Sequence, residues 1–504
     1  MVSIGSIWSF LSSPTNVTLG LIVLLVICAL WSMHIPSGFP PGPRGLPFIG
    51  SILSLGEDPI GVFEGLAKTY GDIFSFKMGA DRYVLLCNIE LVREALVQKQ
   101  DAFAGRAWTY TGEITSDGGE GILFGNFTPK WQAMRKISCK AIRKYTTTGK
   151  LETLIREHVF PRLKKTITEK NGEPFDPQPV LMLTVINIMA SVCFGKFYEL
   201  EDSGFKTCFN YINDSDNFGN GLVADFIPIF RYITTKTVRE MTTWKDNLIE
   251  FLKSEVDDHE KNVGEENASD FIYEILKTKK EAIAAGENIA DVLTDLNVIH
   301  SLSDFFGAGI DTTVNILNFC VAYLVNYPDV QVKVQKEIDD VIGQGRSPSL
   351  SDKGKLPYCE AVINEVLRIR TVLPLGVPHE TLEDTSVGGY NIPKGTKIMT
   401  FFWKVHFDER HWKRPEEFRP ERFLDNDGKA LPKHASLIPF SAGRRVCPGE
   451  TIAINQLILL FASLFQQFCF FPAPGKEKPP LKPVINNLVI RNAPYEVVAK
   501  ERNA

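Results

Sequence analysis

The sequence contains few cysteines, and their spacing matches no common cysteine site. Only 9 of its 504 residues are cysteine, and no two of them are arranged as CxxC. This spacing excludes the usual zinc and dithiol redox pairs. An odd number of scattered cysteines is also not typical of a disulfide framework, so a reducing compartment fits better. Any special role of one cysteine therefore has to be judged from its local sequence.

The chain also lacks an excess of positive charge. It has 55 Lys and Arg residues against 60 Asp and Glu residues, which gives a formal net charge of −5. Because nucleic-acid-binding proteins present a basic surface, this balance argues against nucleic acid as a partner. The sequence has no internal repeat and no long low-complexity tract. With 44% hydrophobic and 23% charged residues, it is a globular chain that can bury a large core.

Charged residues are absent from one apolar run near the N-terminus, Val17 to Met33. As a helix this run spans about 25 Å, enough for a tilted crossing of a thin bilayer. A signal peptide is disfavoured, because no basic residue precedes the run and no clean cleavage site follows it. A buried core helix is the other alternative. The first basic residue after the run is Arg44, which places the rest of the chain in the cytosol. We therefore expect residues 1–34 to be a membrane anchor.

A proline-rich stretch follows, and it contains PPGPRGLP. Proline has no amide donor and fixes φ, so this stretch cannot be helical. We expect residues 35–50 to be a stiff hinge, with an ordinary loop as the alternative. No linker interrupts residues 51–504, which predicts one catalytic domain.

Hydrophobic periodicity predicts that this domain is mainly α-helical with a minor β-sheet. Two short β-like runs flank a glycine turn, and a long apolar run ends just before a proline, where a helix is expected to stop. We expect helices at 291–326, 358–370 and 450–468, and strands at 73–78, 83–87, 390–392 and 397–402.

The most informative segment reads FSAGRRVCPGE, from Phe440 to Glu450. Cys447 precedes a predicted helix, whose N-terminus and nearby amides would stabilise a thiolate. Gly443 and Gly449 permit tight turns, and Arg445 could pair with carboxylates of a flat ligand. A lone cysteine is more often a small buried apolar residue. The whole segment, however, has what a loop needs to hold a haem iron through one thiolate.

At these residues the chain resembles the cytochrome P450 family of haem-thiolate monooxygenases, and the resemblance extends over essentially the whole length. The anchor and hinge are similar to those of microsomal members. The segment from Leu375 to His379 and the tail after Glu450 are most similar to the animal group that contains steroid 17-alpha-hydroxylases and aryl-hydrocarbon-oxidising enzymes. Four further motifs follow the family order: WQAMR at 131–135, AGIDTT at 308–313, EVLR at 365–368 and PERF at 420–423.

The resemblance implies a role for each motif. Cys447 would bind the iron of haem b. Thr312 and Asp311 would deliver protons during oxygen activation, although a helix irregularity without function is the alternative. Glu365, Arg368 and Arg422 would form a buried structural network rather than a surface salt bridge. The residues expected to contact the haem are Trp131, Arg135, His379, Phe440, Arg445 and Gly449.

The resemblance also implies an NADPH- and O2-dependent monooxygenase that hydroxylates a hydrophobic small molecule, steroid-like or aromatic. NADPH would act through NADPH–cytochrome P450 reductase, with cytochrome b5 as a second candidate partner, at the endoplasmic reticulum membrane. A haem-thiolate isomerase or dehydratase and a haem protein that binds diatomic gases are the alternatives. A basic cluster on one predicted helix would dock the reductase: Lys130, Arg135, Lys136, Lys140, Arg143 and Lys144. Substrate contacts are expected within 106–119, 205–212, 305–308, 372–377 and 487–488.

Overall fold

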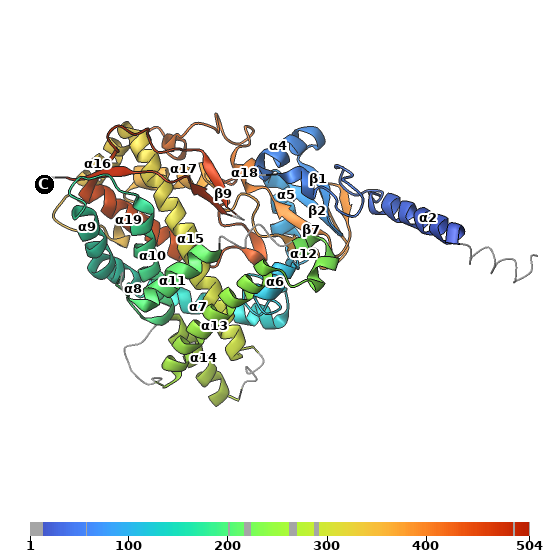
Figure 1. The fold of residues 1–504 in the computed structure, drawn as a ribbon. Helices are drawn as coiled ribbons and strands as arrows, with labels where there is room; N and C mark the ends of the chain where they lie inside the picture. The colour runs from blue at the N-terminus through green and yellow to red at the C-terminus, as the bar shows by residue number, and fades with distance from the viewer. Residues whose placement is uncertain are drawn as a thin grey trace, which may run out of the picture.

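Helix α15 (Asp295–Asn326) passes through the centre of the molecule, with other helices packed around it (Figure 1). Its residues from Thr313 to Val325 are all buried, as expected for a helix that is apolar on every side. The Thr294 side chain accepts a hydrogen bond from the amide of Asn297 and caps the helix start. The protein is seen here as a computed structural model, which describes residues 14–56, 58–199, 202–215, 223–261, 270–286, 292–486 and 489–502.

The predicted long helix is thus confirmed, although it begins at Asp295, and Asp291 lies outside the described residues. Two other predicted helices are confirmed as α17 (Pro357–Ile369) and α19 (Glu450–Gln467). Together with α10 (Pro177–Phe194), they contact α15 and form the main core. At Gly309, an added Cβ would lie only 2.4 Å from Met189 Cε, so glycine allows α10 to pack closely there.

A five-stranded sheet, with the strand order β1-β2-β7-β4-β3, lies at the end of the body nearest the N-terminal helix (Figure 1). The hairpin of β1 (Ile73–Met78) and β2 (Asp81–Leu86) confirms the predicted pair of strands. Strand β7 (Lys397–Thr400) runs parallel to β2. The last two strands are two residues long, β4 (His379–Glu380) and β3 (Gly105–Arg106), and their register sets Arg106 opposite His379.

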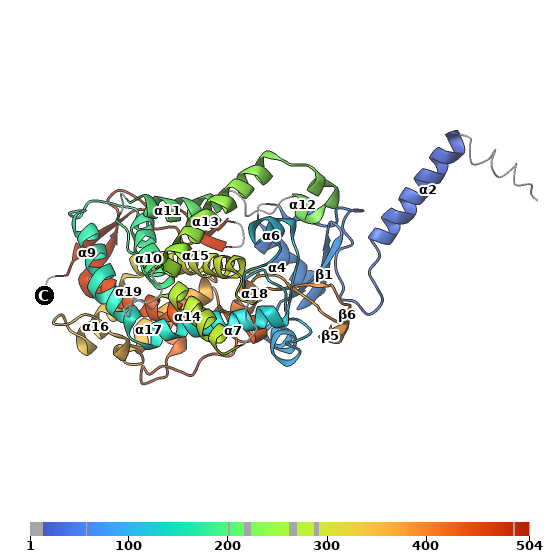
Figure 2. The same cartoon turned by 90° about the horizontal axis from the view of Figure 1, so that it is seen from below.

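The remaining elements are short helices and hairpins around this frame. Figure 2 shows α7, α14 and α17 along one side of α15 and α11 and α13 along the other. The helices are α3 (Ile52–Leu55), α4 (Pro59–Tyr70), α5 (Ile89–Arg93), α6 (Tyr110–Thr115), α7 (Pro129–Thr147), α8 (Lys150–Thr153), α9 (Phe160–Thr168), α11 (Ser203–Ser215), α12 (Val223–Phe226), α13 (Lys236–Lys261), α14 (Phe271–Ala284), α16 (Pro328–Val341) and α18 (Phe402–His406). The π-helical and 3-10 segments are η1 (Glu94–Gln98), η2 (Leu154–Val159), η3 (Pro228–Tyr232), η4 (Leu350–Asp352), η5 (Pro420–Phe423) and η6 (Gly443–Arg445), and the hairpin strands are β5 (Thr385–Val387), β6 (Tyr390–Ile392), β8 (Phe468–Pro472), β9 (Pro483–Asn486), β10 (Val489–Asn492) and β11 (Val497–Glu501).

The N-terminal helix α2 (Pro14–Ser32) projects away from the body (Figures 1 and 2), and its large apolar side chains are exposed. Its apolar part, Thr15–Leu30, is shorter than the roughly 18 or more residues that a membrane-spanning helix needs. Within the described residues, α10 and α15 are long and apolar enough to cross a membrane. However, 78% of the apolar segment of each helix is buried inside the body. These two are therefore core helices of the catalytic body.

The proline-rich stretch is fixed against the sheet rather than free along its whole length. The Ser75 amide donates to the Pro41 carbonyl and the Ser75 hydroxyl donates to the Pro40 carbonyl, both at 2.7 Å. An added Cβ on Gly42 would lie 1.7 Å from the Ser75 carbonyl oxygen, so only glycine fits there. The part of the predicted hinge from Pro40 onward is thus attached to β1.

Candidate active site

A single loop brings Cys447 into an apolar cavity beneath α15. Gly443 has a φ of +71°, and an added Cβ would lie 1.6 Å from the Leu96 carbonyl oxygen, so this position requires glycine. The Cys447 amide then donates to the Phe440 carbonyl at 2.9 Å and closes the turn. Cys447, Phe440 and Gly449 all line the cavity, as does Thr312 from α15.

The environment of the Cys447 thiol differs from the sequence expectation. Burial raises the pKa of this thiol, and the Gly449 amide only partly offsets the effect. A coordinated metal cation deprotonates a thiol outright, so the site is suited to a thiolate that forms when iron binds.

Three arginines and a histidine also line the cavity: Arg106, Arg135, His379 and Arg445. Burial, reinforced by neighbouring arginines, lowers the pKa of Arg106 to about 9 and that of Arg445 to about 8. Such values mean that the cations are buried without enough anionic charge around them. Arg445 Nη1 is buried and has no hydrogen-bond partner among the described residues. Two carboxylates of a flat ligand would complete this cluster, so the site fits the propionates of haem.

Hydrogen bonds to the main chain hold the arginines in place. Arg445 donates from Nε to Ala104 and from Nη2 to Gly125, each at 2.8 Å to the carbonyl oxygen. Arg106 donates from Nε to the Leu123 carbonyl at 2.9 Å and from Nη1 to the Val377 carbonyl at 3.1 Å. These bonds fix the guanidinium planes before any ligand binds, which reduces the ordering cost of binding.

His379 and Trp131 do not present free donors in the way the sequence suggested. Burial and the nearby Arg106 lower the pKa of His379 to about 3, so this imidazole is neutral. Its Nδ1 lies 2.8 Å from the Phe103 carbonyl and must carry the proton. The Trp131 indole donates to the Ile122 carbonyl at 2.9 Å. Instead of offering its N–H, Trp131 stacks beneath the Arg445 guanidinium, 3.8 Å from the ring centroid.

Thr312 and Asp311 lie on different faces of α15. The Thr312 hydroxyl borders the cavity and donates to the Ala308 carbonyl at 2.7 Å. Asp311 does not line the cavity, and its Oδ1 pairs with Arg491 Nη2 at 2.8 Å. Helix α15 passes through this turn without interruption and is continuous from Asp295 to Asn326.

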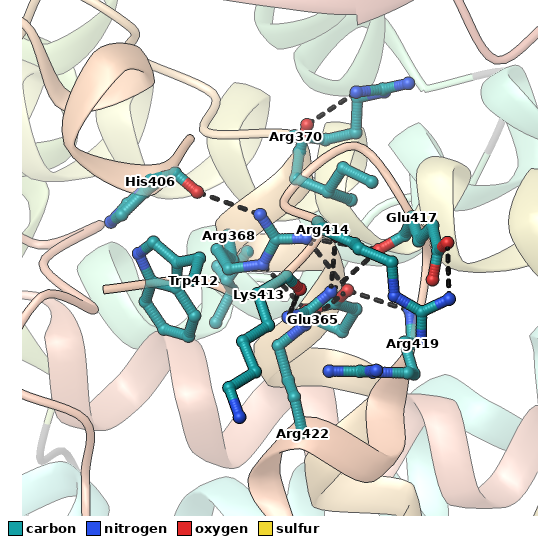
Figure 3. Close-up of polar contacts among 12 residues, drawn as sticks. Glu365, Arg368, Arg370, His406, Trp412, Lys413, Arg414, Glu417, Arg419 and Arg422 are labelled. Carbon is teal, nitrogen blue, oxygen red and sulfur yellow. Dashed lines mark hydrogen bonds and ion pairs between the residues drawn. The ribbon is translucent and has the colours of Figure 1, made fainter. Parts of the chain in front are cut away.

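The predicted Glu365 network is present (Figure 3), with Glu365 and Arg368 fully buried and Arg422 at its edge. Arg368 makes a two-pronged contact with Glu365, with both N···O distances at 2.8 Å, and Arg422 Nε donates to Glu365 Oε1 at 3.0 Å. Arg368 Nη1 also donates to the His406 carbonyl at 2.8 Å. The network thereby joins α17, α18 and η5 behind the cysteine loop, and this position supports a structural role.

The predicted basic cluster on α7 divides into three parts. Lys130 and Lys144 are paired with Glu120 and Glu274. Arg135 turns inward and donates to the Val446 carbonyl, next to Cys447. Exposed side chains that make no ion pair in the described part of the chain remain at Lys136, Lys140 and Arg143.

The predicted substrate segments are only partly at the cavity. Phe305, Ala308 and the stretch 372–377 contribute lining residues, whereas 205–212 contributes none. Residues 487–488 lie outside the described residues. From 106–119 only Arg106 lines the cavity, and it does so as part of the cationic cluster.

Sequence reasoning missed the role of Arg106 and overlooked Asp304. Asp304 lines the cavity, and its Oδ2 accepts the amides of Ile122 and Leu123 at 2.6 and 2.8 Å. Burial raises the pKa of Asp304 to about 6. Arg106 reaches the cavity because it lies opposite His379 in a pair of two-residue strands. No sequence pattern reveals this pairing.

Comparison with known proteins identifies the family and several relatives of this chain. The cytochrome P450 family model matches residues 40–499. A steroid 17-alpha-hydroxylase/17,20 lyase of Squalus acanthias is 34% identical over 96% of this chain and 97% of its own length. Cytochrome P450 1A5 of Gallus gallus is 33% identical over 90% and 89% of the two chains, and cytochrome P450 1A1 of Sparus aurata is 34% identical over 92% of each.

Proposed function

The chain belongs to the cytochrome P450 family of monooxygenases, and from that premise we propose that it uses O2 and NADPH to hydroxylate a hydrophobic small molecule of steroid or polycyclic aromatic type. In this reaction one oxygen atom enters a C–H bond of the substrate, the other leaves as water, and NADPH supplies two electrons. One observation carries the proposal. Cys447, the arginine cluster and Thr312 line the same largely apolar cavity.

Different residues of the cavity would bind different parts of haem b. Cys447 supplies the thiolate to the iron, while Phe440 and Gly449 shape the space beside it. Arg135 and Arg445 hold the propionates, and Arg106 joins them. A contact from His379 to a carboxylate requires a proton on Nε2, because Nδ1 is engaged by Phe103. When bound, the haem supplies the oxidising chemistry.

Thr312 and Asp311 supply protons, and apolar side chains exclude water from the rest of the cavity. The Thr312 hydroxyl can exchange its bond to Ala308 for one to an ordered water, through which a proton would reach the cavity. Steroid and aromatic substrates fit the apolar lining from Phe305, Val372 and Leu373. The names of the relatives, which cover both substrate classes, support this choice.

The basic face of α7 is the proposed docking site for NADPH–cytochrome P450 reductase, with cytochrome b5 as a second donor. Arg135 attaches α7 to the loop of Cys447, so the exposed Lys136, Lys140 and Arg143 flank the thiolate side. An acidic partner would be attracted there, and the attraction would fall with salt. Lys136→Glu and Arg143→Glu should raise the reductase concentration needed for half-maximal rate. The matched control is Lys165→Glu, an exposed lysine on α9. Equal effects of all three changes would reject this docking face.

We place the enzyme at the endoplasmic reticulum membrane, with residues 1–34 as a single-pass anchor, 35–50 as the connection and 51–504 as the cytosolic catalytic domain. The apolar part of α2 spans about 24 Å. A second exposed apolar surface supports membrane contact, because it lies around α12 at the end of the body from which α2 projects (Figures 1 and 2). Its members are Val223, Ile229, Phe230, Tyr232 and Ile233. Protease added to sealed microsomes should digest the body, and full protection would reverse this topology.

The test of the proposed reaction is turnover under labelled oxygen. Full-length protein reconstituted with reductase in lipid vesicles is given NADPH and 18O2 with a panel of steroids and polycyclic aromatics. The expected product carries one 18O atom. Rearrangement of an organic peroxide without NADPH would favour the isomerase or dehydratase. Binding of carbon monoxide or nitric oxide without turnover of any panel member would favour the gas-binding protein.

A further inference from the structure

An ion pair connects the C-terminal hairpin of β9 and β10 to the centre of α15. Arg491 on β10 donates from Nη2 to Asp311 Oδ1 at 2.8 Å, and the two side chains are 13% and 17% exposed. Asn315, one turn further along α15, donates from Nδ2 to the same carboxylate oxygen at 3.1 Å. The carboxylate is therefore held on the face of α15 that contacts β10.

This position separates the acid from the hydroxyl beside it in the sequence. Successive residues of an α-helix point about 100° apart. Thr312 accordingly borders the cavity and donates to Ala308, whereas Asp311 faces the hairpin. A proton that enters at Asp311 has to reach Thr312 by rotation of the carboxylate or through water. Arg491, which holds the carboxylate of Asp311, therefore determines where the path of the proton begins.

The same strand is attached to the wall of the cavity. The amide of Ile490, next to Arg491, donates to the Val372 carbonyl at 2.9 Å, and Val372 lines the cavity. A molecule that displaces Val372 therefore moves the strand that carries Arg491. The hairpin gives a physical connection between what occupies the cavity and where the acid is held.

We propose that Arg491 is a positioning residue for proton delivery: it holds the Asp311 carboxylate at the entrance of the path to Thr312, and β10 makes that position depend on the cavity wall at Val372. The proposal rests on the monooxygenase function proposed above. Arg491 acts through Asp311 and touches neither substrate nor haem. Its loss leaves the acid without a fixed position, so protons arrive out of step with electrons and O2 leaves as hydrogen peroxide.

The test compares Arg491→Met and Arg491→Lys in haem-loaded, full-length enzyme. Arg491→Met should raise the ratio of peroxide to product on the order of tenfold, while the haem content stays unchanged. Arg491→Lys keeps the charge and should restore most of the coupling. Arg491→Met added to Asp311→Asn should cause little further loss, because Arg491 acts only through this carboxylate. The matched control is Arg502→Met, since Arg502 is equally buried, at 16% exposure, but pairs with Asp339 on α16.

A second readout does not depend on turnover. Hydrogen–deuterium exchange of the described hairpin amides, at 484–486 and 489–492, should rise equally in Arg491→Met and Asp311→Asn and no further in the double variant. Additive exchange would overturn the pairing. Coupling that falls in Thr312→Ala but not in Arg491→Met would overturn the role of Arg491 and leave the proposed function standing. No NADPH-dependent product from the unchanged enzyme would overturn both.

Discussion

The guanidinium of Arg445 lies over the ring of Trp131, with its central carbon 3.8 Å from the centroid of the indole ring. Two of its nitrogens are bound to main-chain carbonyls, and the third, Nη1, is buried without a partner in the part of the chain described here. Because two nitrogens already hold the guanidinium in place, the third nitrogen can bind an anion at little entropic cost. The proposed contact of Arg445 with a propionate therefore depends on Trp131 as well, although the two residues are far apart in sequence.

Arg445→Leu should therefore weaken haem binding. The variant loses one charge-assisted hydrogen bond, worth about 1.5–3 kcal/mol, which corresponds to roughly 10- to 100-fold in affinity. Haem transfer to an apo-globin acceptor measures the change. Arg444→Leu is the control, because Arg444 is half exposed and pairs with Asp101 at the surface. Equal haem loss in both variants would contradict the assignment.

Glu365→Gln should destabilise the fold without a direct effect on chemistry. The substitution leaves Arg368 and Arg422 buried with less negative charge, and breaking a buried pair costs about 3–5 kcal/mol. Denaturant unfolding measures the loss. Glu240→Gln removes an exposed pair with Lys236 on α13 and should cost less than about 1 kcal/mol. Equal costs for the two variants would mean that the Glu365 network adds nothing to stability.

His406 should make the protein sensitive to acid. It is fully buried, Nε2 accepts the Ile438 amide at 3.0 Å, and burial together with Arg368 lowers the pKa of His406 to about 3. The unfolded residue titrates near 6.5, so below that pH the unfolded chain binds a proton that the native protein does not. The free energy of unfolding then falls as pH drops from about 6.5 toward 3, by up to about 1.4 kcal/mol per pH unit.

His406→Gln should remove this part of the pH dependence. The unfolding free energies of the variant and the unchanged protein, measured in denaturant at pH 7.5, 6 and 5, should converge as the pH falls. His158→Gln, which changes an exposed histidine on η2, should leave the curve unaltered. Parallel curves for His406→Gln and the unchanged protein would show that His406 is not the titrating group.

Thr312→Ala should keep haem but lose coupling. The haem-binding residues lie elsewhere, so the variant should still consume NADPH and O2. Without the hydroxyl that borders the cavity, protons arrive late and hydrogen peroxide forms. A loss of about two orders of magnitude in product rate is the expected scale. Thr312→Ser keeps the hydroxyl and should restore product. The measurement is the ratio of product formed to NADPH consumed. If this ratio is unchanged in Thr312→Ala with several substrates, Thr312 is only a helix irregularity.

Much of the fold could be predicted because its signals are local. The β1–β2 hairpin follows from two apolar runs around Gly79, and the C-terminal end of α15 follows from Pro328. The contact of Glu365 with Arg368 follows from their spacing of three residues on one helix. These features depend on residues close together in the sequence, so a single sequence contains the information.

What sequence reasoning missed depends on distant segments that meet only in the fold. Arg106 joins the cationic cluster because β3 pairs with β4, which lies 273 positions later in the chain. The Trp131 indole N–H donates to the Ile122 carbonyl, a contact that no sequence pattern indicates. Asp311 was expected beside Thr312, but Arg491 holds it on another face of α15. In each case a partner from another element decides which way the side chain points.

The most direct test of the account is the absorption spectrum of the reduced, carbon-monoxide-bound protein. We predict the red-shifted band of a thiolate-ligated haem in the unchanged protein and in Cys139→Ala, a control cysteine on α7 near the same loop. Cys447→Ala should lose the haem, or retain it without that band. An unchanged red-shifted band in Cys447→Ala would contradict the assignment of the ligand, and with it the proposed chemistry of the cavity.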